Sequence, residues 1–378
     1  MIDRRSFVGG SALLGTAGAA QASPCAEAAA PAPHRPARSI AVEEAFAVPE
    51  QFEAMRRLLD AGGTHDLEVD RWRPMLSNMS SRRVRELLDI DGERLERMTA
   101  TGLSMHVLSL TSPGVQTFDA DTAVGVAAAA NDRLAEACRR HPTRFAGLAS
   151  FAPQDPRRAA REIERAMTRL NLNGLIVNSH TRGEYLDAPK FEPILEAAAA
   201  TGAAIYIHPR LPPAAMAQYY MPLTTGERPE SGFYTLMGFT AETLLHGMRL
   251  IVSGVFDKYP KLKIVLGHMG EGLPYLTWKL DSGYEIFGAY SPSQRTRKLP
   301  SQYIKENFLF TTSGFFSQDN LEYMHRVVGP DGIMFAVDYP YYKMEDGMAF
   351  LNATRLPKDD VDKLAFRNAE RVFRIPSA

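Results

Sequence analysis

The sequence contains few cysteines, no excess of charge of either sign and no long uninterrupted apolar run. Its 378 residues include only two cysteines, Cys25 and Cys138, which excludes a disulfide framework. Lysine plus arginine number 43 and aspartate plus glutamate 44, so the net charge of −1 gives no electrostatic basis for binding nucleic acid or an anionic membrane. No stretch predicts a membrane-spanning helix. The length and the 45% apolar content are sufficient for one large domain with a substantial core.

The first 38 residues differ in composition from the rest of the chain. Residues 1–22 read MIDRRSFVGGSALLGTAGAAQA, with an arginine pair, a mildly apolar glycine- and alanine-rich stretch and an Ala-Gln-Ala cleavage pattern. This arrangement is typical of a twin-arginine signal peptide and predicts a periplasmic protein; a chance arginine pair in a disordered tail is the alternative. Residues 23–38, rich in alanine and proline, are interpreted as a linker, which leaves 39–378 as one domain.

Short apolar runs alternate with amphipathic segments throughout this domain. Strand–helix alternation of this kind predicts parallel βαβ units, and eight runs in about 300 residues favour a (β/α)8 TIM-like barrel over an open sheet. The predicted strands are 40–42, 104–110, 145–149, 174–178, 204–208, 263–268, 308–312 and 333–338. The first connection, residues 45–102, is much longer than the others, and we expect it to cover the active site.

Polar side chains follow several of these apolar runs directly. Glu43, His208, His268 and Asp338 all stand at predicted carboxyl ends of strands, which is where barrel enzymes carry their catalytic groups. Titratable groups gathered at one barrel mouth would repel or desolvate one another without a cation, so the pattern predicts a divalent metal. Two carboxylates and one imidazole suit Mn²⁺ or Mg²⁺, with Zn²⁺ and Fe²⁺ as alternatives. Two anionic ligands reduce the ability of the metal to lower the pKa of a bound water. The site is therefore better suited to binding a chelating anionic substrate than to generating a metal-bound hydroxide.

Five motifs occur in order at these positions: VEEAFAVPE, YIHPR, GHMGEGLPY, TTSGFF and VDYPY. Together they resemble the decarboxylase branch of the amidohydrolase superfamily, whose members are metal-dependent, non-oxidative decarboxylases of hydroxylated aromatic acids. The similarity extends from about residue 40 to residue 373. The segments VLSLTSPGVQTFD and NSHTRGEYLDAPKFEPILEAA resemble 5-carboxyvanillate decarboxylases more than gamma-resorcylate or 2,3-dihydroxybenzoate decarboxylases.

Two departures from the hydrolases of the superfamily concern the number of metal ions. Glu43 and Ala45 stand where those hydrolases carry His-x-His, and Asn178-Ser179-His180 replaces their bridging lysine. The resemblance therefore implies one divalent ion per chain, with Mn²⁺ preferred and Zn²⁺ or Mg²⁺ as alternatives. It also implies a small aromatic acid as substrate and a homodimer or homotetramer as the assembly.

The resemblance further implies roles for individual residues. By the resemblance, the metal ligands are Glu43, His208 and Asp338, and the catalytic residues are His268, Glu271 and Asp338. The ring-carbon proton comes either from Asp338, oriented by His268, or from His268 itself, and the sequence leaves both open. Candidate substrate contacts are Thr111, Tyr341 and a set of cations: Arg82, Arg83, Arg85, Arg210 and Lys279.

Two other functions remain open at the level of sequence. A metal-dependent hydrolase of the same superfamily, for example a lactonase, would require water activation, which Glu43 and Ala45 disfavour. A barrel that binds an aromatic ligand without turnover would have no need for the whole set of polar residues at the strand ends.

Overall fold

The computed structural model describes residues 34–62, 66–216, 237–288 and 296–377, and it contains one sheet of eight parallel strands in the order β1 to β8. The strands are β1 (Ile40–Phe46), β2 (Met105–Leu110), β3 (Phe145–Ser150), β4 (Gly174–Asn178), β5 (Ile205–His208), β6 (Ile264–Leu266), β7 (Phe308–Thr311) and β8 (Ile333–Met334). Each predicted run overlaps one of them, although β1 and β3 extend beyond the predicted ends. The predicted signal peptide, residues 1–22, and most of the predicted linker lie outside the described residues.

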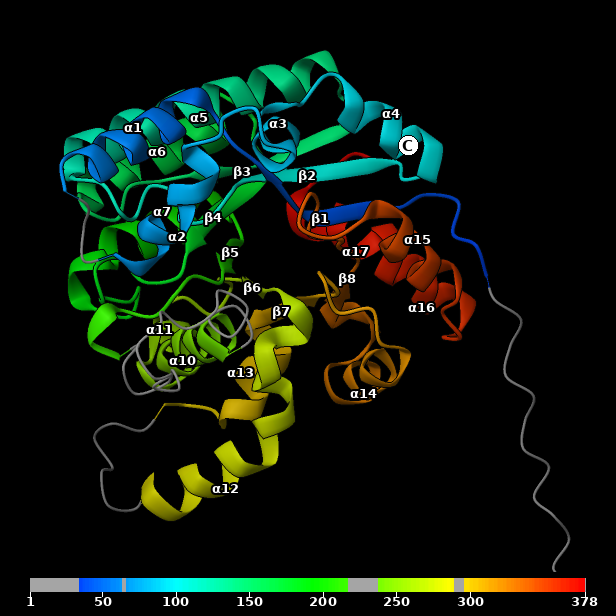
Figure 1. The fold of residues 1–378 in the computed structure, drawn as a ribbon. Coiled ribbons are helices and arrows are strands. Elements are labelled where there is room, and N and C mark those ends of the chain that lie inside the picture. The colour runs from blue at the N-terminus through cyan, green and yellow to red at the C-terminus, as the bar shows by residue number, and fades with distance from the viewer. Residues whose placement is uncertain (1–33, 63–65, 217–236, 289–295, 378) are drawn as a thin grey trace, which may run out of the picture.

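The sheet curls into a barrel that closes between its first and last strands (Figure 1). The Val42 N–H donates to the Phe335 carbonyl at 3.1 Å, and the Ala45 N–H donates to the Tyr339 carbonyl at 2.7 Å. Strand β8 is shorter than the predicted run 333–338, because the regular ladder with β7 ends at Met334, and the carbonyls of Phe335 and Tyr339 accept from β1 instead. The (β/α)8 barrel predicted from the sequence is thereby confirmed.

Helices surround the barrel (Figure 1). They are α1 (Pro49–Asp60), α2 (Leu67–Leu76), α3 (Arg82–Leu88), α4 (Glu93–Thr101), α5 (Ala120–Arg140), α6 (Pro156–Thr168), α7 (Glu192–Thr201), α10 (Phe239–Val252), α11 (Val255–Lys258), α12 (Thr277–Gly288), α13 (Pro300–Asn307), α14 (Gln318–Val328), α15 (Met344–Asn352), α16 (Lys358–Asp362) and α17 (Asn368–Phe373). In its described part, the long connection between β1 and β2 thus holds four α-helices, α1 to α4. The side chain of Asp66 caps α2 by accepting from the Glu68 N–H, and Trp72 of α2 packs on Phe52 of α1.

Apolar side chains form two layers, one inside the barrel and one between the barrel and the helices. The inner layer includes Ile40, Val42, Met105, Val107, Ala146, Leu148, Ile176, Tyr206, Val265, Leu309 and Met334. A one-residue β-bulge interrupts β1, since Ala41 pairs with His106 but Glu44 pairs with Leu108. The extra residue breaks the strict alternation of sides, so Val42 and Glu43 both face the barrel interior while Glu44 faces the helices.

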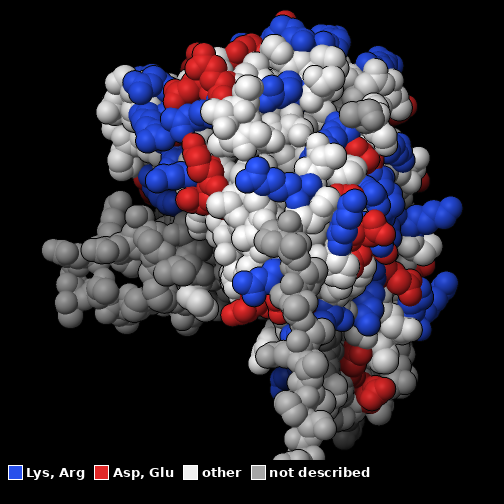
Figure 2. All heavy atoms as spheres, turned by 90° about the vertical axis from the view of Figure 1, so that its right-hand side faces the viewer, with Lys and Arg blue, Asp and Glu red and all other residues white. Residues whose placement is uncertain are grey.

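Charges of both signs are interspersed on the face that carries α4, α15 and α16 (Figure 2). Several of them form ion pairs there, such as Arg97 with Glu93 and Arg367 with Asp362. Among the described residues, every helix is too short or too polar to cross a membrane.

Candidate active site and metal centre

Glu43 lies at the mouth of the barrel with its two carboxylate oxygens in different environments. Oε2 accepts hydrogen bonds from the hydroxyls of Tyr206 and Ser313, and from Thr311 at 3.2 Å. Oε1 is buried and has no hydrogen-bond partner among the described residues. It lies 3.5 Å from Nε2 of His208. One oxygen is therefore fixed by neutral donors while the other is left available for a ligand.

His208 and Asp338 direct their side chains to the same point. Nδ1 of His208 is 2.6 Å from the carbonyl of Pro209, so Nδ1 carries the proton and the lone pair of Nε2 is turned to Glu43. Asp338 follows β8 with a left-handed backbone (φ 70°), and its Oδ1 is buried without a hydrogen-bond partner in the described part of the chain. One ligand atom from each of Glu43, His208 and Asp338 can be chosen so that all three lie within 4.8 Å of one another.

These three side chains fit a divalent cation. Two nearly buried carboxylates this close are unfavourable without a positive charge, and each leaves one buried oxygen unpaired. Burial raises the pKa of Asp338; His268 opposes that shift, and the charge of Glu43 adds to it. An O, O, N donor set matches Mn²⁺, Mg²⁺ or Zn²⁺.

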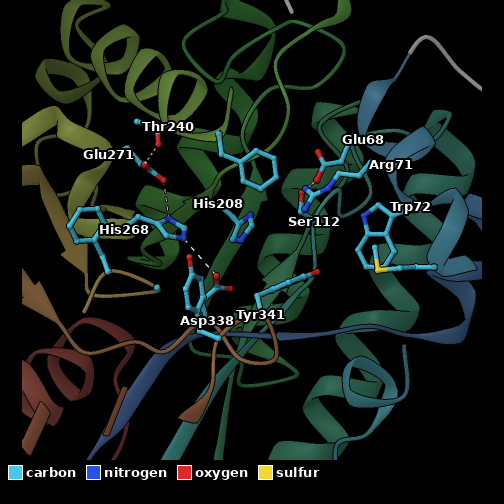
Figure 3. Close-up of a pocket in the computed structure, with 15 residues that line it drawn as sticks. Glu68, Arg71, Trp72, Ser112, His208, Thr240, His268, Glu271, Asp338 and Tyr341 are labelled. Atoms are coloured by element: carbon cyan, nitrogen blue, oxygen red, sulfur yellow. Dashed lines mark hydrogen bonds and ion pairs between the residues drawn. The ribbon is translucent and has the colours of Figure 1, made fainter. Parts of the chain in front are cut away.

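A left-handed turn after β6 brings His268 and Glu271 together. Every residue from His268 to Gly272 has φ between 48° and 85°. This turn places Nδ1 of His268 2.9 Å from Oε1 of Glu271, and Nε2 of His268 lies 3.7 Å from Oδ2 of Asp338. Thr240, at the start of α10, donates to Oε2 of Glu271 at 2.7 Å, which completes a row of four side chains (Figure 3).

The electrostatics of the site favour a protonated His268. Burial alone would lower its pKa, but the negative charges of Glu43, Glu271 and Asp338 together raise the pKa well above its ordinary value. The glycine before His268 is sterically required, because a Cβ at Gly267 would lie 2.6 Å from Oε2 of Glu43.

A cavity of about 470 Å³ opens above these residues (Figure 3). Its lining consists of Glu68, Arg71, Trp72, Met75, Ser112, His208, Phe239, Thr240, His268, Glu271, Gly314, Phe315, Asp338, Tyr341 and Tyr342. The predicted residues Tyr341, His208, His268, Glu271 and Asp338 are therefore brought together on one wall. Thr111 does not line the cavity; it contacts Tyr341 through a hydroxyl–hydroxyl bond of 2.6 Å. Burial raises the pKa of Tyr341 to about 12, which keeps its hydroxyl protonated.

The cations predicted to bind substrate do not line this cavity. Arg82 pairs with Glu86 at 2.8 Å on the surface, and Lys279 is exposed on α12. Arg85 is also exposed and donates to the Ser80 carbonyl. Arg83 comes nearer, with its guanidinium 5.0 Å from the ring of Tyr341.

Arg210, the last of the predicted cations, lies away from the cavity lining in a buried cluster of charged side chains. It is buried, pairs with Asp66 at 2.6 Å and lies 3.5 Å from Glu68. Glu68 also accepts from the Ser112 hydroxyl and from the Leu211 N–H. These contacts fasten the first turn of α2 to the loops that follow β2 and β5.

Helix α2 supplies the residues that the sequence did not single out. Glu68, Arg71, Trp72 and Met75 lie on one face of this helix and line the cavity. Arg71 is half-buried, its guanidinium is 5.5 Å from the ring of Phe239, and it forms no ion pair with the described residues. Their spacing of three and four residues within the segment LEVDRWRPML is the signal that could have identified them.

The fold and the site define a (β/α)8-barrel enzyme with a candidate metal centre. A family model described as "Amidohydrolase" matches residues 78–375, and the chain belongs to that family. Gamma-resorcylate decarboxylase of Rhizobium sp. (strain MTP-10005) is 33% identical over 350 residues, which are 90% of this chain and 99% of the relative. Aromatic-acid decarboxylases, which are carboxy-lyases, are thus relatives along almost the full length.

Solved structures of related enzymes superpose on the chain. The crystal structure of 5-carboxyvanillate decarboxylase from Sphingomonas paucimobilis has a TM-score of 0.84 and 40% sequence identity, covering 90% of this chain and 99% of that one. The 5-carboxyvanillate decarboxylase of Novosphingobium aromaticivorans has a TM-score of 0.82 and 36% sequence identity, and the match covers 89% of this chain and 96% of that one. That second structure contains manganese and 4-hydroxy-3-methoxy-5-nitrobenzoic acid.

Proposed function

We propose that this protein is a metal-dependent, non-oxidative decarboxylase of an ortho-hydroxylated aromatic carboxylic acid, of the 5-carboxyvanillate type. The observation that carries the proposal is the convergence of Glu43, His208 and Asp338 beside the His268–Glu271 pair, next to a cavity that aromatic side chains also line. Relatives that act on such acids and bind manganese support it.

Glu43, His208 and Asp338 would hold one divalent ion per chain, with Mn²⁺ preferred and Zn²⁺ or Mg²⁺ as alternatives. When bound, the ion supplies a positive charge that neutralises and orients the phenolate and carboxylate oxygens of the substrate. Trp72, Phe239 and Tyr341 are available to pack against the aromatic ring.

The reaction begins with transfer of a proton to the ring carbon that bears the carboxylate. Loss of CO₂ from the unprotonated ring would leave a high-energy aryl carbanion, whereas prior protonation forms a C–H bond and a dearomatised ring. The bond from that carbon to the carboxylate then breaks, its electron pair restores the aromatic ring, and CO₂ leaves. The Asp338–His268 pair is the proton source, because Oδ2 and Nε2 are 3.7 Å apart on the cavity wall. Glu271 and Thr240 keep His268 oriented from its other side.

Arg71 supports a substrate with a second carboxylate. Within the described residues, it is the only arginine or lysine that lines the cavity. Tyr341 lines the cavity as well, and its protonated hydroxyl could donate a hydrogen bond to the same group. A dicarboxylic acid such as 5-carboxyvanillate could thus place one carboxylate at the metal centre and the other at Arg71.

The test uses purified protein loaded with Mn²⁺ and a panel of ortho-hydroxybenzoates that includes 5-carboxyvanillate. CO₂ release and ring absorbance are followed together, and the chelator-treated protein is the control. Metal-dependent CO₂ release is the expected result. A protein that binds one ion per chain but releases no CO₂ from any acid, while opening an aromatic lactone, would replace the decarboxylase by a hydrolase.

We also propose that the protein is exported to the periplasm by the twin-arginine signal and assembles as a homodimer or homotetramer. The arginine pair and cleavage pattern of residues 1–22 support the first proposal. Apolar side chains exposed at α12 and just before it, Tyr275, Trp278 and Ile286, support the second. Cell fractionation tests the export to the periplasm, and light scattering of the purified protein measures the number of subunits.

A further inference from the structure

Glu44, the neighbour of the proposed ligand Glu43, is a fully buried carboxylate that the mechanism above does not use. It faces away from the cavity, and its oxygens accept three consecutive backbone N–H groups. Oε1 accepts from Val337 at 2.9 Å and from Asp338 at 3.3 Å, and Oε2 accepts from Tyr339 at 2.9 Å. A single side chain from β1 thus satisfies the backbone of the segment that follows β8.

This segment needs an external partner. Asp338 has a left-handed backbone (φ 70°), which is uncommon for a residue with a Cβ and persists only where the surroundings impose it. Residues 337–339 lie beyond the end of β8, so a strand ladder does not hold their N–H groups. Without an acceptor these buried donors would be unsatisfied, and the direction of the Asp338 side chain would not be fixed.

Two further buried groups, Arg94 and His106, lie near Glu44. Arg94 is completely buried and donates to the Ala45 carbonyl at 2.7 Å and the Glu86 carbonyl at 3.1 Å. Its guanidinium lies 4.9 Å from the ring of Tyr339. Burial raises the pKa of Glu44 to about 8, and the positive charge of Arg94 opposes that shift. Nε2 of His106 lies 3.9 Å from Oε2 of Glu44.

We propose that Glu44 is a positioning residue for the metal centre: it holds residues 337–339 so that the Asp338 carboxylate meets Glu43 and His208. Two adjacent glutamates on β1 then have complementary tasks, one as a ligand and the other in orienting a ligand from the far end of the sheet. The inference rests on the proposed function only in that the three side chains bind a divalent ion.

The experiment compares Mn²⁺ binding by the wild-type chain, Glu44→Gln and Glu242→Gln, using the dissociation constant measured directly on metal-free protein. Glu44→Gln keeps the shape of the side chain but places an NH₂ group against backbone donors. We expect its Mn²⁺ dissociation constant to rise roughly 10- to 100-fold, the usual effect of losing a group that orients a ligand. Glu242 is a matched control, since its buried carboxylate accepts from Ser179 and Tyr185 and not from residues 337–339. The Mn²⁺ dissociation constant of Glu242→Gln should stay within about twofold of wild type, because substitutions at independent sites have little effect on one another.

Glu44→Asp is a second variant should the glutamine variant not fold. It keeps the carboxyl group but is one methylene shorter and cannot reach all three N–H groups, so a smaller rise in the dissociation constant is expected. Equal Mn²⁺ affinity of wild type and the Glu44 variants, or an equal rise in Glu242→Gln, would overturn the positioning role alone. A wild-type chain that does not bind Mn²⁺ would overturn the proposed metal centre, and with it this role. Because binding is measured without substrate, the result does not depend on which acid is decarboxylated.

Discussion

Replacing Arg71 by methionine should selectively impair the reaction of a substrate with two carboxylates. Methionine retains an unbranched apolar stem against Phe239 but removes the charge that Arg71 presents to the cavity. A hydrogen bond between charged partners contributes about 1.5–3 kcal/mol at a partly buried site. Since 1.4 kcal/mol corresponds to a factor of ten, kcat/KM for 5-carboxyvanillate should fall roughly 10- to 100-fold.

The assay is CO₂ release at saturating Mn²⁺, measured for 5-carboxyvanillate and for an ortho-hydroxybenzoate that lacks the second carboxylate. The loss should appear mainly in KM and only with the dicarboxylic acid, and the metal content should not change. Arg82→Met is the matched control, because Arg82 belongs to the same long connection but pairs with Glu86 on the surface. Its kinetics should equal those of wild type.

The reasoning about Arg71 would be refuted by an equal loss of kcat/KM for both acids. That result would mean that Arg71 shapes the cavity, or contacts the group that all substrates share. A fall in metal content in Arg71→Met would likewise show that its effect is on the metal centre.

Three further predictions concern the metal centre and a buried carboxyl group. Asp338→Asn should abolish metal-dependent CO₂ release and lower the Mn²⁺ content measured by elemental analysis. Retained turnover would exclude Asp338 both as a metal ligand and as part of the proton source. Mn²⁺ at 100 times its dissociation constant should add about 2.7 kcal/mol to the free energy of unfolding, detected as a higher Tm that chelator reverses; an unchanged Tm would contradict a site in the folded state. Burial raises the pKa of Glu242 from 4.5 to about 7. The folded protein therefore gains stability from the protonated carboxyl group below pH 4.5 and loses it as the pH rises to about 7. The free energy of unfolding should fall by on the order of 3 kcal/mol over this range. Glu242→Gln should flatten that decline in urea titrations, and an identical pH dependence in both proteins would refute the assignment.

The sequence predicted the parts of the site that lie at strand ends. Apolar runs of strand length followed at once by His208 or Asp338 locate these residues by local pattern alone, and the carboxyl ends of parallel strands must meet at one barrel mouth. Glu271 and Tyr341 were predicted because they lie within three residues of such ends, in motifs with a family resemblance.

The cation facing the cavity could not be predicted in the same way. Arg71 and Arg82 belong to one long connection, and the sequence gives no reason to prefer either. The choice depends on how α2 is docked, which the buried contacts of Glu68 with Arg210 and Leu211 determine. Glu68 and Leu211 are 143 residues apart in the chain.

By itself, then, the sequence determined the barrel, the long first connection and the polar residues at the strand ends, because each depends on local periodicity or on spacing along the chain. The resemblance already implied Glu43 as the ligand, but only the tertiary structure shows why Glu43, and not the adjacent Glu44, faces the candidate metal centre. A strict alternation from Ile40 and Val42 would have turned Glu44 inward, and it is the bulge in β1 that places Glu43 there instead. The bulge arises in the pairing of β1 with β2, and the three N–H groups of residues 337–339 reach Glu44 only when the barrel closes, so both depend on contacts between segments far apart in the chain.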